Sequence, residues 1–121
     1  MNSLLKSFGF AFQGIFHLIK KERNFKIQFS VFILVLFSAF YFQLSKYEWI
    51  VLLVCSMIVM SLEAINTSIE QLCDLTESNI NPKIKIIKDV AAGAVLIASL
   101  FSIVIGLIIF IPRIYKLVES L

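Results

Sequence analysis

Two glutamates, Glu63 and Glu70, lie inside a stretch of sequence that is otherwise typical of a membrane-spanning helix. An ionisable side chain in hydrocarbon costs roughly 2.5–3.5 kcal/mol on insertion scales, so it normally faces a bundle interior and marks a functional site. On a helix, the polar residues of this stretch fall on one face. They are Glu63, Asn66, Thr67, Glu70 and Asp74. The sequence therefore predicts a polar stripe, suited to chemistry, inside a membrane protein.

The composition supports a membrane protein. Of the 121 residues, 60% are hydrophobic and twelve are Phe, and the mean hydropathy is +0.94, whereas a soluble domain is about half apolar. The length allows one compact unit, so we expect a single membrane domain over residues 1–121. The net charge of +3 comes from lysines near the predicted membrane boundaries, where they signal topology and contact anionic lipid. This placing argues against a nucleic-acid-binding face.

The two cysteines, Cys55 and Cys73, lie on the same predicted helix, about five turns apart. They cannot pair with each other within one chain, because a disulfide needs nearby Cα atoms. We interpret them as apolar packing residues. No Cys or His pair has the spacing of zinc ligands, so a zinc site is not supported.

Residues 3–20 have the pattern of an amphipathic helix, with Lys6, His17 and Lys20 on its polar side and Phe and Ile side chains on the other. We expect a surface helix over about residues 3–22, lying in the membrane interface. A signal peptide is the competing interpretation. It is disfavoured because the apolar residues are periodic and no small-residue cleavage site precedes Lys20.

Three further segments are long and apolar enough to cross a bilayer, which takes about 20 residues. We expect these transmembrane helices over about residues 27–45, 48–73 and 82–111. A short turn with an aromatic interface belt is predicted at Lys46–Trp49, and a loop at residues 74–81. Asn81 as N-cap and Pro82 at the first helical position open the third helix. Residues from Arg113 onward are predicted to form a short tail.

The positive residues predict the orientation of the chain in the membrane. Of those near the ends of the spans, seven fall on one side and three on the other. The larger group is Lys20, Lys21, Arg23, Lys26, Lys83, Lys85 and Lys88, and the smaller is Lys46, Arg113 and Lys116. This bias puts the amino terminus and the 74–88 segment in the cytoplasm, and three spans then leave the carboxy terminus outside. We therefore expect a multi-pass protein of the plasma membrane.

The third span carries a small residue at every fourth position, at Ala94, Ala98, Ser102 and Gly106. Such spacing lets membrane helices approach each other closely. Three spans alone can scarcely enclose a buried polar stripe, so we expect the chain to associate with copies of itself.

The depth of the carboxylates indicates two kinds of ligand. Glu63 lies some 16 Å of helix inward from Asp74 at 1.5 Å per residue, and Glu70 lies nearer the water. A lipid hydroxyl can meet Glu63, while a soluble anion with its metal can meet Glu70, Glu22 and Lys88. Magnesium prefers one or two carboxylates with phosphate oxygens and water, and a nearby lysine offsets phosphate charge. None of the common nucleotide-binding motifs is present, so a nucleotide would need a different scaffold.

These residues resemble a known family. The segment Glu63-Ala-Ile-Asn-Thr-Ser-Ile-Glu70, with Asp74 after it, is similar to the small integral-membrane diacylglycerol kinases of bacteria. The likeness covers about residues 3–112 and is greatest to the Gram-positive undecaprenol kinases. The segments that carry this second resemblance are Phe12-Gln-Gly-Ile, Lys20-Lys-Glu-Arg-Asn24, Glu48-Trp49, Leu62-Glu-Ala-Ile-Asn-Thr67 and Lys88-Asp-Val-Ala-Ala-Gly-Ala-Val-Leu96.

The resemblance implies ATP-dependent phosphorylation of a lipid alcohol by a homotrimer, each protomer having one surface helix and three membrane helices. Glu63 matches the family's general base, which takes the proton from the lipid hydroxyl. Asn66 matches an active-site amide near the transferred phosphate, and Ala92 joins Glu63 at the lipid substrate. Gln28 stands where the diacylglycerol branch has a glutamate, which favours undecaprenol as the substrate.

The resemblance also implies a set of nucleotide-binding residues. Glu22 and Glu70 match the carboxylates that bind the Mg²⁺ bridging the nucleotide phosphates. Lys88 and Asp89 match a pair that contacts the nucleotide. Phe10 stands where the family often has a tyrosine near the nucleotide, so this contact departs from the family pattern.

Three other interpretations stay open. A diacylglycerol kinase making phosphatidic acid would use the same chemistry on another lipid. A transporter or proton pathway would spread carboxylates over the whole membrane depth, whereas the uncharged runs 27–45 and 90–112 of the first and third spans have none. A noncatalytic adaptor would use the glutamates for packing. This interpretation does not explain why Glu63 has no cation partner at its depth. The oligomer number and the order of substrate binding do not follow from the residues.

Overall fold

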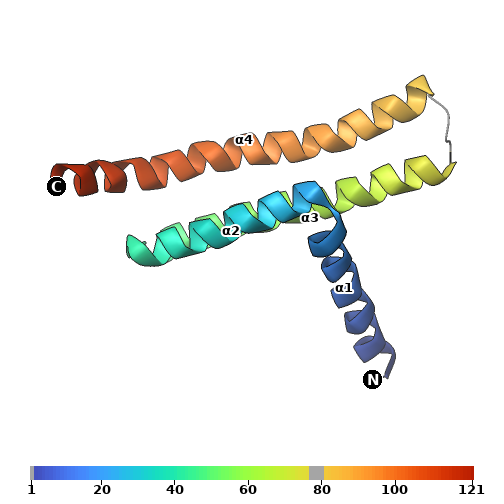
Figure 1. The fold of residues 1–121 in the computed structure, drawn as a ribbon, viewed down its shortest axis with the longest axis horizontal. Coiled ribbons are helices and arrows are strands. Elements are labelled where there is room, and N and C mark those ends of the chain that lie inside the picture. The colour runs from blue at the N-terminus through green and yellow to red at the C-terminus, as the bar shows by residue number, and fades with distance from the viewer. Residues whose placement is uncertain (1, 77–80) are drawn as a thin grey trace.

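The structure is a computed structural model that describes residues 2–76 and 81–121, which form helices and no strand. The helices are α1 (Asn2–Lys21), α2 (Arg23–Tyr41), α3 (Lys46–Thr76) and α4 (Pro82–Glu119). Of these, α2, α3 and α4 are each long and apolar enough to cross a membrane. Figure 1 shows these three helices running side by side, with α1 leaving them at an angle. The predicted all-α membrane architecture with three spanning helices is confirmed.

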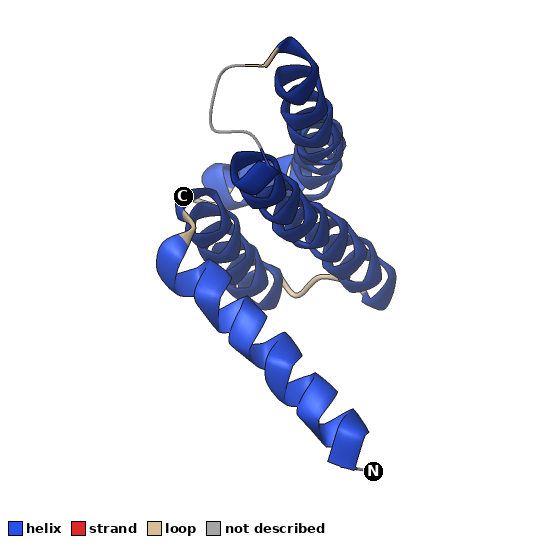
Figure 2. Ribbon diagram, turned by 90° about the vertical axis from the view of Figure 1, so that its right-hand side faces the viewer, coloured by secondary structure: helices blue, strands red, loops and turns tan. Residues whose placement is uncertain are grey.

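The first helix, α1, contacts the rest of the chain only near its end. Every described residue before Leu18 is exposed, and Figure 2 shows α1 pointing away from the three long helices. The chain changes direction at Glu22, whose backbone is extended with φ −98° and ψ 114°. A helix thus fills the region predicted as 3–22, while its placing in the membrane interface stays a prediction.

The second helix starts and ends earlier than the predicted 27–45. The N–H of Gln43 bonds the Phe40 carbonyl and the N–H of Leu44 bonds the Ala39 carbonyl, both at 3.2 Å. With Gln43 at a positive φ of 53°, these bonds form a Schellman motif, which ends a helix. The apolar run hides this turn because Phe42 and Leu44 are uncharged yet not helical.

The segment predicted as a turn at Lys46–Trp49 is instead the first turn of α3. The N–H of Ser45 donates to Oε1 of Glu48 at 3.0 Å, and the N–H of Glu48 donates to Oγ of Ser45 at 3.3 Å. This reciprocal pair is a capping box, which satisfies two backbone donors at the start of a helix. A capping box therefore starts α3 directly after the α2 turn.

The fourth helix continues through Pro112, so the predicted boundary at 111 and the tail from Arg113 are wrong. Proline lacks the N–H that would continue the helical ladder. Here Nη1 of Arg113 donates to the Ile109 carbonyl at 2.9 Å, and its Nη2 pairs with Oε1 of Glu48 at 2.6 Å. These bonds hold the end of α4 against the start of α3.

Four of the eight buried apolar residues among those described gather at this same end of the bundle. Ala39, Leu44, Leu52 and Ile109 form one cluster, and the ring of Phe42 contacts that of Phe110 at 6.0 Å between centroids. At the other end, α3 runs on to Thr76, so residues 74–76 of the predicted 74–81 loop are helical; residues 77–80 lie outside the described residues. Asn81 caps α4 as predicted, because its side chain accepts from the Lys83 N–H at 2.9 Å.

Candidate active site

A cavity of about 320 Å³ lies where α2, α3 and α4 meet, near the junction with α1. We call it the polar cavity. Its lining residues are Asn24, Ile27 and Gln28 of α2, Glu63, Asn66 and Glu70 of α3, and Ala92, Val95, Leu96 and Ser99 of α4. Four of the residues that the family resemblance singles out thus share one cavity: Glu63, Asn66, Glu70 and Ala92.

The polar stripe of α3 faces the interior at its deep end. Glu63, Asn66 and Thr67 are 4–5% exposed and are the buried polar residues among those described. Glu70 is half-buried and Asp74 is exposed. Burial therefore decreases along the stripe, from Glu63 toward the end of α3.

Glu63 has polar neighbours but no cation. Asn24 of α2 lines the cavity beside its carboxylate, and the charges that act on it are those of Glu70 and Glu22. Within the described ranges, every ion pair involves other carboxylates. A buried carboxylate without a cation is costly, so packing alone does not account for the position of Glu63.

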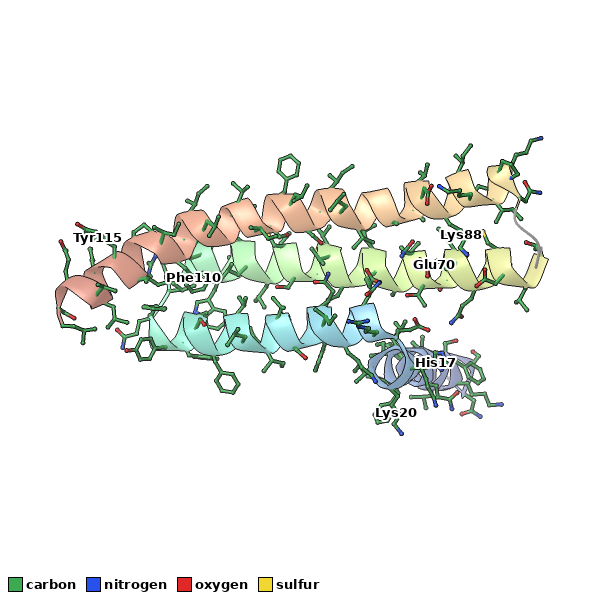
Figure 3. All side chains as sticks on the ribbon, turned by 45° about the horizontal axis from the view of Figure 1, so that its top comes forward. His17, Lys20, Glu70, Lys88, Phe110 and Tyr115 are labelled. Atoms are coloured by element: carbon green, nitrogen blue, oxygen red, sulfur yellow. The ribbon has the colours of Figure 1, made fainter. Side chains whose placement is uncertain are left out.

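Asn66 connects the deep part of the cavity to Glu70. Its Nδ2 donates to Oε1 of Glu70 at 3.2 Å, across one turn of α3. This bond holds the Glu70 carboxylate along the helix, toward the end where Lys88 lies; Figure 3 shows Glu70 and Lys88 near each other, far from Phe110 and Tyr115.

Lys88 and Glu22 approach this region from the two neighbouring elements. Nζ of Lys88 pairs with Oδ1 of Asp74 at 2.9 Å and feels the charge of Glu70. Glu22, in the α1–α2 junction, accepts a hydrogen bond from Nε2 of Gln71 at 3.3 Å. Glu22, Glu70 and Lys88 thus lie around the last turns of α3, between Glu70 and Asp74.

Two predicted nucleotide-binding residues lie elsewhere in the single chain. Asp89 is on the exposed side of α4, where it pairs with Lys85 at 2.6 Å. Phe10 is on α1 and is 67% exposed. Neither residue lines the polar cavity.

The carboxylates fit a magnesium ion that is held together with phosphate. Within residues 2–76 and 81–121, no group of three or more His, Cys, Asp or Glu side chains can form a metal site of its own. Mg²⁺ does not require one, since it usually binds one or two carboxylates with substrate phosphates and water. Glu22 and Glu70, whose charges both act on Glu63, have carboxylate oxygens of the kind that such a site needs.

A second cavity, of about 500 Å³, runs between α2, α3 and α4 from Gln28 to Phe110, and we call it the apolar cavity. It shares Ile27, Gln28 and Ser99 with the polar cavity, so the two adjoin. Its volume is in the range of ligand pockets, about 300–1,000 Å³. The sequence did not indicate this cavity, because it depends on how far α2 and α4 lie apart across α3.

Sequence reasoning also missed two residues of the polar cavity, Asn24 and Ser99. Asn24 follows the charged run before α2, where it reads as a boundary residue. Ser99 follows Ala92 and Val95 at helical spacing on α4, which is a signal that could have placed it on the same face.

Comparison with known proteins agrees with this arrangement. The sequence profile described as prokaryotic diacylglycerol kinase matches residues 9–110. The chain is 38% identical over 113 residues to the undecaprenol kinase of Bacillus subtilis, which covers 93% of this chain and 92% of that protein. It is 34% identical over 116 residues to the diacylglycerol kinase of a Synechocystis species, covering 95% of this chain and 66% of that protein.

Three apolar helices around an embedded carboxylate site, together with these relatives, define a membrane lipid kinase. The chain belongs to the prokaryotic diacylglycerol kinase family.

Proposed function

We propose that this lipid kinase transfers the terminal phosphate of ATP to undecaprenol, making undecaprenyl phosphate at the cytoplasmic face of the plasma membrane. The observation that carries the proposal is Glu63, a buried carboxylate without a cation, in a polar cavity that adjoins an apolar one. An alcohol with a long hydrocarbon tail fits both cavities, because its hydroxyl suits the polar cavity and its tail suits the apolar one. The similarity to the Bacillus subtilis undecaprenol kinase supports this substrate.

In this proposal, Glu63 is the general base. It takes the proton of the lipid hydroxyl as the oxygen attacks the terminal phosphorus of ATP, and the bond from that phosphorus to the ADP oxygen breaks. A base must come within about 2.6–3.2 Å of the hydroxyl to act. The adjoining apolar cavity gives the tail a place that leaves the hydroxyl near Glu63, while Asn66 lies beside the transferred phosphate and holds Glu70.

The nucleotide lies on the cytoplasmic side of Glu63. Glu22 and Glu70 would hold the Mg²⁺, which neutralises charge on the phosphates during transfer. Lys88 adds a positive charge near Glu70. Phosphoryl transfer needs mainly positioning and charge neutralisation from the protein, and these residues offer both.

Phe10 and Asp89 belong to this proposal only within an assembly. We propose a homotrimer, in which neighbouring protomers bring these two residues to the nucleotide. The many exposed apolar side chains of α2, α3 and α4 are compatible with contacts to lipid and to further copies of the chain.

A diacylglycerol kinase is the second candidate, favoured by the similarity to the Synechocystis enzyme. The chemistry and the roles of Glu63 and Glu70 would be the same. Gln28, which lines both cavities, argues against it, because the resemblance to the diacylglycerol branch calls for a glutamate at this position.

The experiment that separates the two candidates offers both lipids to one enzyme. Purified protein in mixed micelles receives labelled ATP with undecaprenol and diacylglycerol in the same tube, and the labelled products are separated. We expect label mainly in undecaprenyl phosphate. Label mainly in phosphatidic acid would keep the catalytic assignment and replace the substrate.

A further inference from the structure

Two buried side-chain atoms among the described residues have no hydrogen-bond partner, Oδ1 of Asn66 and Oγ of Ser99. Both residues line the polar cavity, Asn66 from α3 and Ser99 from α4. Buried polar atoms in proteins are almost always paired, so each exception needs an explanation. Two exceptions in one cavity indicate a ligand group that both can bind.

The hydroxyl of Ser99 is buried and unpaired, unlike those of Ser30, Ser38 and Ser68 in these helices. A helical serine commonly donates to the carbonyl four residues before it. Ser30, Ser38 and Ser68 do so, at 2.8, 2.9 and 3.1 Å. Ser99 makes no such bond although its Oγ is buried, so its hydroxyl is free to bind what enters the cavity.

Ser99 also stands at the border between the two cavities. It lines the polar cavity with Glu63 and the apolar cavity with residues such as Phe110. A lipid alcohol has its hydroxyl at one end of a hydrocarbon tail. With the tail in the apolar cavity, the hydroxyl reaches this border.

We propose that Ser99 binds the hydroxyl of the lipid substrate and orients it toward Glu63; this rests on the proposed function. The Ser99 O–H donates to a lone pair of the substrate oxygen. The single O–H of the substrate points between Glu63 and Asn66 Oδ1, which share it as acceptors. As the proton passes to Glu63, negative charge grows on the substrate oxygen. The Ser99 hydrogen bond is then stronger in the transition state than in the ground state, and this difference lowers the barrier to phosphate transfer.

The test compares Ser99→Ala and Ser99→Thr with the unchanged enzyme, using undecaprenol and labelled ATP in mixed micelles. We expect Ser99→Ala to lower kcat/KM for undecaprenol about tenfold, as for loss of one hydrogen bond in a site built for it, with the KM for ATP unchanged. Ser99→Thr keeps a hydroxyl and should restore most of the activity. Ser30→Ala is the matched control: its hydroxyl bonds the Lys26 carbonyl and lines neither cavity, so its kinetics should equal those of the unchanged enzyme.

Unchanged kinetics in Ser99→Ala would overturn this inference and leave the proposed function in place. So would an equal loss in the Ala and Thr variants, which would assign Ser99 to packing alone. A KM for ATP that is the same in Ser99→Ala as in the unchanged enzyme also shows that the variant is folded. If the unchanged enzyme transferred no phosphate to undecaprenol, the proposed function would fail first and the role of Ser99 with it.

Discussion

At the scale of single residues, Glu63 is set apart by its surroundings. Three other carboxylates of the described chain have cation partners: Glu48 pairs with Arg113, Asp74 with Lys88 and Asp89 with Lys85. Glu22, Glu70 and Glu119 form no ion pair with a described residue, but none of them is buried. Glu63 is 4% exposed and has Asn24 as its polar neighbour instead. Removing a carboxylate from water without a cation is unfavourable for stability, and the proposed role as general base gives a reason for its position.

The metal assignment gives a prediction at Glu70. Glu70→Gln removes the charge yet leaves an oxygen that can accept from Asn66, so the helix should keep its local hydrogen bond. We expect the affinity for ATP with Mg²⁺ to fall at least about tenfold, in line with loss of a charge-assisted contact of about 1.5–3 kcal/mol. Titrating ATP at several magnesium concentrations measures this.

The control for Glu70 is Glu119→Gln, which removes a carboxylate at the far end of α4. It should leave nucleotide affinity as it is. The same magnesium dependence in the unchanged enzyme, Glu70→Gln and Glu22→Gln would show that these two carboxylates do not hold the metal.

At the scale of helices, the start of α3 is fixed by several contacts of one short segment. Ser45 and Glu48 form the capping box, and Glu48 also pairs with Arg113 of α4. The Arg113 and Glu48 side chains are 30% and 23% exposed. One carboxylate thus caps α3 and ties it to α4, opposite the end that carries the polar cavity.

The capping box predicts a loss of stability without a loss of chemistry. Ser45→Ala removes the oxygen that accepts from the Glu48 N–H, which should cost about 1 kcal/mol. Thermal unfolding in detergent should show a lower Tm than that of the unchanged protein, while kcat per folded molecule stays the same. Ser45→Thr keeps the cap and should unfold near the original temperature; equal Tm values in all three proteins would contradict the role of the cap.

How far the sequence predicts these helices depends on the kind of signal. Runs of apolar residues predict that three spanning helices exist, because length and hydropathy suffice for a span. They do not predict that α2 ends at Tyr41, since that end is a backbone turn at Gln43 without charge, Gly or Pro. Pro112 suggested an end to α4, but the helix continues through it to Glu119. Next to this proline, the Arg113 side chain bonds the Ile109 carbonyl.

In the candidate site, too, some features follow from the sequence and others depend on how the helices pack. The spacing of Glu63, Asn66 and Glu70 on one helix predicts their shared face, because helical periodicity alone decides it. The partners from other helices, Asn24 and Ser99, depend on how α2 and α4 pack on α3. Periodicity within one segment does not contain that information.

At the scale of the whole molecule, the two ends of the bundle differ. One end has the buried apolar cluster and the ion pair of Glu48 with Arg113. The other has the polar cavity, the α1 junction and the start of α4. The larger group of lysines and arginines lies toward this second end, which supports the proposal that it faces the cytoplasm.

The orientation can be tested with single cysteines. Ser3→Cys and Ser120→Cys are made separately in a chain with Cys55→Ala and Cys73→Ala, and intact cells receive a thiol reagent that does not cross membranes. We expect labelling at position 120 in intact cells, and at position 3 only after the cells are opened. Labelling at position 3 in intact cells would reverse the proposed topology.

The measurement that tests the central claim most directly is phosphate transfer by Glu63→Gln beside the unchanged enzyme. Both receive labelled ATP and undecaprenol in mixed micelles, and ATP binding is measured on the same samples. We expect the unchanged enzyme to make labelled undecaprenyl phosphate. Glu63→Gln should lose at least about 10²–10⁴-fold in kcat, the usual contribution of a general base, while it still binds ATP. Full turnover by Glu63→Gln would contradict its role as the base, and loss of ATP binding would move Glu63 to the metal site.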